Sequence, residues 1–468
     1  MPTDIAHHPD RLLPADPTTR AVARRLLEHT QDLPIISPHG HVDPRLLLDN
    51  QPFPDPTQLL ISPDHYVTRL MHANGVDQGQ LRVGGSTDAS AREAWRLFCS
   101  HWNDFDGTAS GYWLREEFST VFGVDDASIN TENADAIYDQ LTERIAREDM
   151  RPRALFERFN IEVLATTDDP VDDLEAHRLL RDDPTFTGRV LPTFRPDAYV
   201  TLGPQFADRV QSLLAAAGIS GTDFASYLGA LQSRRQYFVD HGAVSADHGA
   251  LTPRTLRMDP AEAQRLFAKG LAGTATPEEA RAFEAHMLYQ MARMSTEDGL
   301  VMTIHPGVHR NTHPDTLRRF GPDTGHDIPF GVDYSTGLRH ILEDFGTTPG
   351  FHLIPFTIDE TVFSREIAPL AGFYPSVFIG APWWFLDAPD AMNRFREAVT
   401  ETAGFTRGSG FIDDTRAFCS IPARHDASRR VDAGYLARLV SEHRLNEDRA
   451  VEIAIDLVDG SPRRAFKL

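Results

Sequence analysis

Eight short apolar runs, each ending in polar or charged residues, limit the fold of this chain more than any other feature. The runs are LPIISPHGH (33–41), IEVLATTDD (161–169), RVLPTFR (189–195), GAVSADH (242–248), LVMTIHP (300–306), FHLIPFTID (351–359), SVFIGAPWW (376–384) and GFIDDTR (410–416). Runs of this length are typical of the buried strands of a parallel sheet. Helical periodicity fills much of the sequence between them, as in 277–299, 336–345 and 389–404. This alternation predicts an α/β protein, a (β/α)8 TIM-type barrel.

The length of the chain is compatible with a single elaborated barrel over 1–468, because barrels tolerate long insertions. The stretch from 42 to 160 is too long for one connection and contains a helical pattern at 89–102. We therefore expect an inserted helical subdomain, 42–160, after the first strand. The pattern from 432 to 466 predicts two closing helices.

A formal net charge of −22 excludes the basic surface that nucleic acids and anionic membranes require. Neither an N-terminal apolar signal core nor an apolar stretch long enough to span a membrane is present, and the two cysteines, Cys99 and Cys419, suggest no disulfide framework. We expect a soluble cytoplasmic protein whose partner is a small molecule. The sequence leaves the oligomeric state open, a homo-oligomer included.

The polar residues that end the runs are the candidate functional residues, because the carboxyl ends of parallel barrel strands form the catalytic face. They are His39, His41, Asp168, Asp169, Arg195, Asp247, His248, His305, Asp359, Trp383, Asp414 and Arg416. Any one of them alone is as compatible with a structural role as with a functional one. For Asp168 and Asp169 we favour capping of the next helix, because Pro170 suits its first turn.

His39 and His41 are two residues apart, so in an extended segment both rings project to the same side. Asp414 closes the last run, and the first and last strands of a closed barrel are neighbours. His39, His41 and Asp414 could then form an N,N,O site for zinc or a similar divalent ion. A hydrogen-bonded loop pair is the structural alternative.

Longer motifs resemble a known family. They are HGH (39–41), DHYVTRLMHANGV (64–76), TTDDP (166–170), LPTFRPD (191–197), SADHG (245–249), IHPGVHRN (304–311), GAPWWF (380–385) and DDTRAFCSIPARHD (413–426). Their identity and order resemble the uronate isomerase (glucuronate isomerase) family, a branch of the amidohydrolase superfamily.

The resemblance implies interconversion of D-glucuronate with D-fructuronate and of D-galacturonate with D-tagaturonate. It also implies site residues at matching positions. Tyr66 corresponds to a tyrosine that reaches into the site, and Asp414 with Arg416 to an Asp-X-Arg motif. The substrate-binding positions implied in the same way are Arg195, Asp247, His248, His305, Arg310 and Trp383.

These residue types suit an aldose to ketose conversion, which needs a base at C2, a proton donor at C1 and stabilisation of an enediol. We expect Asp414 or His39 to be the base and Tyr66 to relay a proton between adjacent oxygens. Arginine pairs with a carboxylate in a bidentate manner, so Arg195, Arg310 and Arg416 are candidates for the uronate carboxylate. Trp383 could offer the sugar ring an apolar face, with core packing as the alternative.

The chemistry requires no organic cofactor, and we expect a bound metal not to be essential because no water is added to the substrate. The main rival is a mononuclear metal-dependent hydrolase. A binuclear hydrolase is disfavoured, because the only lysines, Lys269 and Lys467, lie in a helical segment and at the extreme C-terminus. A non-catalytic sugar-acid binder is the second rival.

Overall fold

Short parallel strands form the centre of the computed structural model, which describes residues 8–124 and 129–468. One sheet has the order β1-β2-β3, and a second has the order β4-β5-β6-β9. Their strands are β1 (Ile35–Ser37), β2 (Ile161–Ala165), β3 (Arg189–Leu191), β4 (Thr193–Phe194), β5 (Ser245–His248), β6 (Val301–Ile304) and β9 (Leu353–Pro355). The protein is therefore an α/β protein with parallel sheets, as the sequence predicts.

The two sheets follow one another closely along the chain and in space. A parallel bridge between Asp168 and Phe194 continues the pairing past β2, and Asp168 N donates to Thr193 O at 2.9 Å. Within the second sheet, Asp247 of β5 is in register with Thr303 of β6, which pairs with Ile354 of β9. A small antiparallel pair, β7 (Val308–His309) and β8 (Ile328–Pro329), lies outside these sheets.

The seventh and eighth predicted strands, 376–384 and 410–416, differ from expectation. The run 376–384 contributes single parallel bridges, Leu353 with Val377 and Ile379 with Gly408, in place of a continuous ladder. The run 410–416 forms neither a strand nor a bridge. Gly380 lies so close to Phe356 that an added Cβ would be 2.6 Å from its ring, and Asp414 has a left-handed φ of 44°. The left-handed backbone at Asp414 interrupts extended pairing in the last run, whereas Gly380 N still donates to Pro355 O at 3.2 Å.

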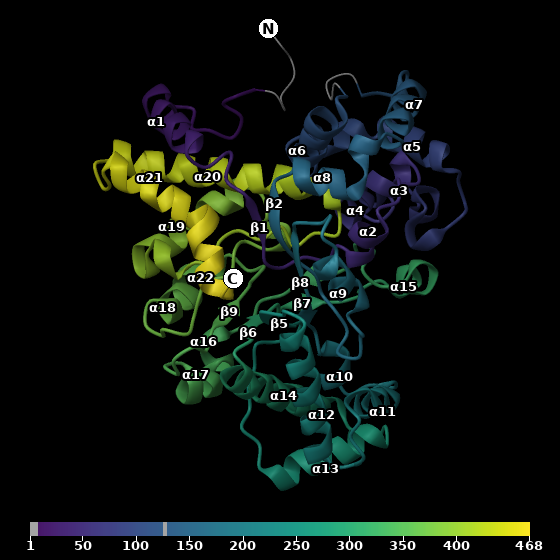
Figure 1. The fold of residues 1–468 in the computed structure, drawn as a ribbon, viewed down its shortest axis with the longest axis vertical. Coiled ribbons are helices and arrows are strands. Elements are labelled where there is room, and N and C mark those ends of the chain that lie inside the picture. The colour runs from purple at the N-terminus through teal and green to yellow at the C-terminus, as the bar shows by residue number, and fades with distance from the viewer. Residues whose placement is uncertain (1–7, 125–128) are drawn as a thin grey trace.

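Helices surround the strands and fill the intervals between them (Figure 1). Between the strands from β2 onward lie α9 (Glu175–Asp182), α10 (Asp197–Val200), α11 (Phe206–Ala217), α12 (Phe224–Asp240), α13 (Pro260–Leu271), α14 (Pro277–Asp298), α15 (Pro314–Phe320), α16 (Tyr334–Gly337) and α17 (Arg339–Phe345). After β9 come α18 (Ala368–Ala371) and α19 (Pro389–Ala403). Local sequence sets their ends. Thr276 and Glu279 form a capping box before α14, and Gly299 terminates it with a φ of 82°.

The regular elements described between 42 and 160 are helical. They include α2 (Pro44–Asp49), α3 (Pro56–Leu60), α4 (His65–Ala73), α5 (Ala91–Ser100), α6 (Ala109–Glu116), α7 (Ala134–Ile145) and α8 (Pro152–Arg158). Residues 125–128 of this region lie outside the described residues. So do residues 1–7, the first part of the N-terminal segment in which the sequence shows no apolar signal core. The chain closes with α20 (Ile421–Ser441), α21 (Glu447–Ile455) and α22 (Ser461–Phe466), so α20 begins before 432.

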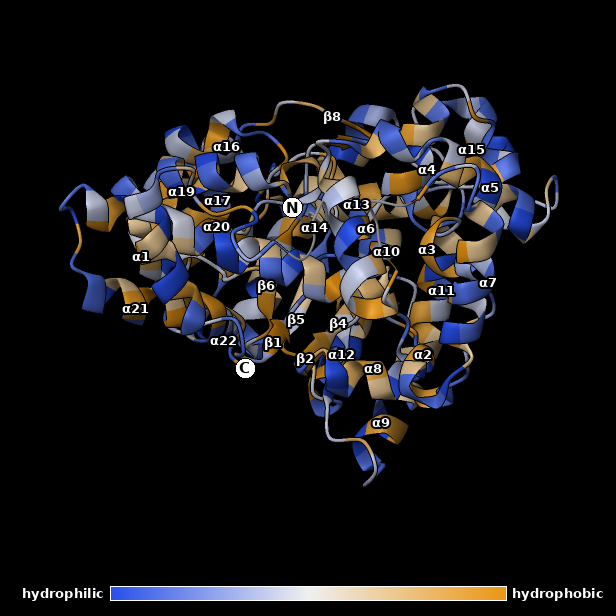
Figure 2. Cartoon of the chain, turned by 90° about the horizontal axis from the view of Figure 1, so that it is seen from above, coloured by the Kyte–Doolittle hydropathy of each residue, from blue (hydrophilic) through white to orange (hydrophobic). Residues whose placement is uncertain are grey.

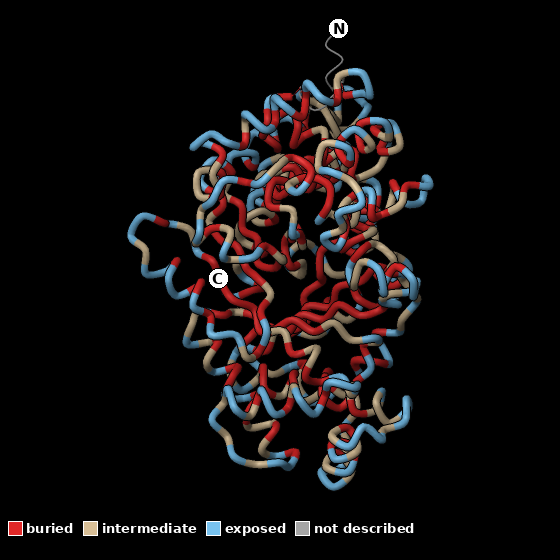
Figure 3. The backbone as a smooth tube through the Cα atoms, turned by 90° about the vertical axis from the view of Figure 1, so that its right-hand side faces the viewer, coloured by how far each residue is buried: buried red, intermediate tan, exposed pale blue. Residues whose placement is uncertain are grey.

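Apolar side chains form one core around the strands and a second among the helices of 42–160. The second contains Trp95, Phe98, Phe105 and Phe118, all of which are fully buried. In Figure 2 the strands β1 and β2 are mainly hydrophobic, whereas the surrounding helices carry both hydrophilic and hydrophobic residues, and Figure 3 shows the buried central segments. The first helix, α1 (Pro17–Glu28), packs its apolar face on α20 and α21.

Two further expectations concern cysteines and membranes. Cys99 and Cys419 are both free and buried. In the described part of the chain, no helix combines the length and apolarity needed to cross a membrane.

Substitution of the buried Arg235 tests how α12 and α14 are held together. Its side chain is fully buried, donates from Nε to Asp298 at 2.5 Å and from Nη2 to Ser295 Oγ at 2.9 Å, and so joins α12 to α14. Arg235→Met leaves Asp298 without this partner, so we expect a loss of about 3 kcal/mol in the free energy of unfolding, measured by urea denaturation.

Arg265→Met is the matched control. Arg265 makes exposed ion pairs with Glu262 at 2.7 Å and with Glu279 at 3.0 Å, and such surface pairs contribute little to stability. Equal losses in the two variants would contradict the assignment of Arg235 as a buried clamp.

Candidate active site

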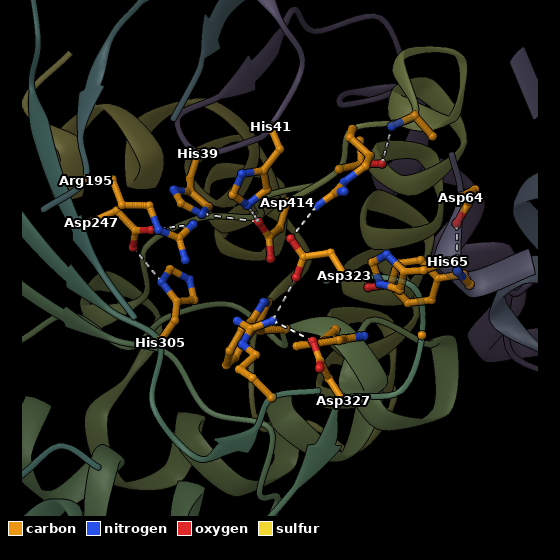
Figure 4. Close-up of a pocket in the computed structure, with 18 residues that line it drawn as sticks. His39, His41, Asp64, His65, Arg195, Asp247, His305, Asp323, Asp327 and Asp414 are labelled. Atoms are coloured by element: carbon orange, nitrogen blue, oxygen red, sulfur yellow. Dashed lines mark hydrogen bonds and ion pairs between the residues drawn. The ribbon is translucent and has the colours of Figure 1, made fainter. Parts of the chain in front are cut away.

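One pocket gathers side chains from many of the strand ends. The predicted residues that line it are His39, His41, Tyr66, Arg195, Asp247, His305, Arg310, Trp383, Asp414 and Arg416. His39 and His41 follow β1, Asp247 lies in β5 and His305 follows β6. Residues far apart in sequence therefore meet because their parallel segments end at the same side of the fold (Figure 4).

His39, His41 and Asp414 converge on one atom. The Nε2 atoms of His39 and His41 lie 3.2 Å and 2.9 Å from Asp414 Oδ1, yet this buried oxygen has no directed hydrogen bond. Three ligand-type atoms that approach one another without directed hydrogen bonds fit the donor set of a divalent ion. A second group of the same kind, His39, Asp247 and His305, shares His39 with the first.

The ionisation of this group follows from burial and neighbouring charge. Burial opposes ionisation of Asp414, but the two imidazoles outweigh it and hold the pKa of its carboxyl well below the usual range. Burial also acts against protonation of His39, but Asp247 and Asp414 outweigh it and raise the pKa of His39. For His41 burial prevails and its pKa is lowered.

Asp247 holds His305 in a fixed orientation. Its Oδ1 lies 2.7 Å from His305 Nδ1 and accepts from Thr303 Oγ1 at 2.7 Å. The buried Nε2 of His305 has no hydrogen-bond partner. The imidazole stacks on Phe356 with ring centroids 4.3 Å apart and meets Trp383 edge to face at 4.7 Å. A carboxylate that fixes one imidazole nitrogen leaves the other free for a ligand.

Tyr66 enters the pocket from the first turn of α4. Asp64 caps this helix by accepting from Tyr66 N at 2.8 Å, and the Tyr66 ring meets Trp113 edge to face. Burial raises the pKa of the Tyr66 hydroxyl, so it is a neutral proton donor and acceptor. Behind it, Arg424 lies 3.6 Å above the Trp113 ring and pairs with the buried Asp387 at 2.8 Å.

Three guanidinium groups line the same pocket, each beside at least one carboxylate. Arg195 Nε donates to Asp197 at 2.8 Å, and Arg310 Nη1 lies 3.0 Å from Asp327. Arg416 Nη2 is 3.6 Å from Asp323. A cluster of arginines at the carboxyl ends of parallel strands is suited to a small anionic ligand.

Four of the candidate residues, Asp168, Asp169, His248 and Asp359, do not line this pocket. Of these, His248 is the one implied by the family resemblance. It is buried with Nδ1 2.9 Å from Thr303 O, and burial lowers its pKa to about 4. Asp168 accepts from Thr166 Oγ1 at 2.7 Å and Thr193 N at 3.0 Å, while Asp169 forms a turn with Val171 N. The expected capping of the next helix is wrong, because α9 begins only at Glu175 and Leu174 occupies its cap.

Sequence reasoning missed several pocket residues, above all Asp64, His65, Asp323, Asp327 and Trp384. Asp64 and His65 belong to the motif that contains Tyr66, so that motif could have identified them. His65 stacks on Tyr66 with centroids 4.7 Å apart, and burial lowers its pKa to about 3. Asp323 and Asp327 lie between two apolar runs, where strand-end reasoning gives no signal.

The fold and the pocket define an α/β enzyme with acid-base groups and arginines on one catalytic face. A family model described as glucuronate isomerase matches residues 18–460. The uronate isomerase of Corynebacterium efficiens is 59% identical over 469 residues, which cover 100% of both chains.

Solved structures agree with this match. The glucuronate isomerase from Caulobacter crescentus superposes with a TM-score of 0.96 at 47% identity, covering 98% of this chain and 96% of that one. The uronate isomerase from Thermotoga maritima gives a TM-score of 0.92 at 27% identity, with 98% and 99% covered. The chain belongs to the glucuronate isomerase family and is an aldose-ketose isomerase. The family resemblance of its motifs is confirmed.

The two groups of potential metal ligands, one with Asp414 and one with Asp247, lead to different predictions for zinc binding. Asp247 Oδ1 is engaged by His305 and Thr303, and its Oδ2, which has no directed hydrogen bond, lies 3.4 Å from the positively charged Arg195, which disfavours a cation there. Asp414 Oδ1 is instead approached by the Nε2 atoms of His39 and His41 and has no directed hydrogen bond. We expect Asp414→Asn to weaken zinc binding by at least about 100-fold and Asp247→Asn to weaken it by less than about tenfold, by titration with elemental analysis. The reverse order would assign the ion to His39, Asp247 and His305.

Proposed function

We propose that this protein interconverts D-glucuronate with D-fructuronate and D-galacturonate with D-tagaturonate. The observation that carries the proposal is that His39, His41 and Asp414 line one pocket together with Tyr66 and three arginines. Membership of the glucuronate isomerase family supports isomerisation over the mononuclear hydrolase and over a non-catalytic binder.

We also propose that the parallel segments form a (β/α)8 barrel as one elaborated domain over 1–468. In support, His41 N donates to Thr415 O at 3.0 Å, which joins the segment after β1 to the last run, and isolated bridges continue the order beyond β9. In this arrangement 42–160 is a helical insertion after the first strand, and 432–466 belongs to the closing helices.

The proton transfer follows from the charge states of the pocket. While no ion is held there, Asp414, held as a carboxylate, is the base for the C2 proton, and His39, whose pKa is raised, is the donor at C1. Tyr66 stays protonated and relays a proton between the adjacent C1 and C2 oxygens. We favour Asp414 over His39 as the base because the Asp414 carboxyl is held in the unprotonated form that accepts a proton, whereas the raised pKa of His39 favours the protonated form that a donor needs.

Substrate binding uses the remaining groups. Arg195, Arg310 and Arg416 bind the C6 carboxylate, for which a planar guanidinium is the better partner than an ammonium. Asp247 and His305 bind hydroxyl groups, and Trp383 presents an apolar edge to the sugar. His248, the buried last residue of β5, contacts Thr303 O of β6 and supports this wall without touching the substrate.

His39, His41 and Asp414 would hold one zinc or similar ion. When bound, the ion would polarise the sugar carbonyl and orient hydroxyls. No organic cofactor enters the proposal, because the side chains supply the base, the acid and the hydroxyl relay.

Ketose formation from a substrate panel tests the function. We expect turnover of D-glucuronate and D-galacturonate, with kcat/KM for D-glucose lower by at least about 100-fold, since an unpaired guanidinium costs about 2–5 kcal/mol. Arg416→Met removes a half-exposed side chain, so it should reduce this preference without changing the melting temperature. Comparable rates for glucose and glucuronate in the unmodified protein would refute the proposal.

Chelation tests the role of the metal. Isomerisation adds no water, and arginine and histidine can stabilise enediolate charge, so removal of the ion should lower turnover by less than about tenfold, or ~1.4 kcal/mol. Metal-free protein, verified by elemental analysis, would be assayed for fructuronate. Complete loss of activity that stoichiometric zinc restores would contradict this and bring the chemistry closer to that of the metal-dependent hydrolases.

A further inference from the structure

Asp323 lies inside the candidate active site although no strand ends near it in sequence. It belongs to the loop between α15 and β8 and adopts a left-handed φ of 58°, which is uncommon for a residue with a side chain. Gly325 in the same loop approaches α4 so closely that an added Cβ would be 2.6 Å from Arg69 Cβ. The loop is thus held against α4 with the Asp323 carboxylate in the middle of the pocket (Figure 4).

The Asp323 carboxylate lies between two of the arginines that we assign to the substrate. Its Oδ2 is 3.6 Å from Arg416 Nη2, and its Oδ1 is 3.7 Å from Arg310 Nη1. Partial burial opposes ionisation of Asp323, but Arg416 and Arg310 outweigh it and lower the pKa of the carboxyl. A carboxylate shared by two guanidinium groups is the arrangement that a bound uronate would itself make.

Both contacts are weak enough to be exchanged. They exceed the length of a hydrogen bond, and the side chains of Asp323, Arg416 and Arg310 are 45%, 41% and 40% exposed. Solvent-exposed ion pairs of this kind contribute little to stability. A substrate carboxylate can therefore replace Asp323 beside the two arginines at little cost in free energy.

Asp327 provides the contrast within the same segment. Its carboxylate is 2% exposed, lies 3.0 Å from Arg310 Nη1 and accepts from Asn311 N at 2.6 Å. These short contacts fix Arg310 in place. Asp327 is thus an anchor of the pocket wall, while Asp323 faces the arginines from the ligand side.

We propose that Asp323 is an internal stand-in for the substrate carboxylate, a specificity-determining residue that occupies the Arg310 and Arg416 subsite until a sugar acid displaces it. The inference rests on the proposed function for the assignment of these arginines to the uronate. Without a substrate, Asp323 offsets the repulsion between two like charges. A sugar acid replaces one carboxylate with another, whereas a neutral sugar offers no charge to exchange and meets an occupied subsite.

Asp323→Asn tests the proposal, because the amide keeps the shape and removes the competing charge. A subsite blocked in about 70–90% of molecules would raise the apparent Kd by ~3- to 10-fold, so the variant should lower KM for D-glucuronate by that factor, with the effect on KM rather than kcat. D-gluconate, which has no aldehyde to isomerise, should bind more tightly by the same factor in calorimetry. Asp323→Glu, which keeps the carboxylate, should remain close to the unmodified protein.

Two control variants separate competition from other effects. Asp327→Asn should raise KM, because Arg310 loses its anchor. Asp315→Asn removes a charge from α15, where Asp315 pairs with Arg318 on the surface, and should change neither KM nor gluconate affinity.

The outcomes distinguish the two proposals. An unchanged or raised KM together with unchanged or weaker gluconate binding in Asp323→Asn would overturn the stand-in role. If the unmodified protein failed to isomerise uronates, the proposed function would fall, while tighter gluconate binding in Asp323→Asn would still support the stand-in role.

Discussion

The backbone hydrogen bond from His41 N to Thr415 O is the contact on which the active site depends. It joins the segment after the first strand to the last run of the chain, and it brings His39 and His41 within reach of Asp414. Asp413, close to Thr415, ties the last run to α20, because its Oδ2 lies 3.1 Å from His425 Nε2. Because α20 in turn packs against α1, the two ends of the chain support a site that neither contains.

The arginines explain how a protein with a net charge of −22 can bind an anion. The overall charge acts weakly at the pocket, since salt screens distant exposed charges within about 10 Å. Local geometry decides instead. Asp197 and Asp327 hold Arg195 and Arg310 at hydrogen-bonding distance, and Asp323 is a looser neighbour of Arg416. The carboxylates thus both position the positive charge of the site and neutralise it while no ligand is bound.

Strand positions and most site residues could be predicted because they depend on local patterns. A buried parallel strand must be apolar, and the polar residue at its end must face the catalytic side, so Asp247 and His305 followed directly from two runs. His248 illustrates the limit of this reasoning. Successive side chains of a strand point to opposite sides, so its neighbour Asp247 faces the pocket while His248 contacts Thr303 O.

By itself the sequence determined the α/β class, the order of the parallel strands and the family, because periodicity and long motifs are written in consecutive residues. Tertiary structure decided which carboxylates accompany the arginines. Asp323 and Asp327 lie in a loop whose sequence resembles any polar turn, and only the packing of that loop against α4 directs Asp323 into the pocket. Tertiary structure also left the expected strand 376–384 with single bridges and the expected strand 410–416 without regular pairing. The close approach of Gly380 to Phe356 and the left-handed backbone of Asp414 depend on distant neighbours that no local pattern records.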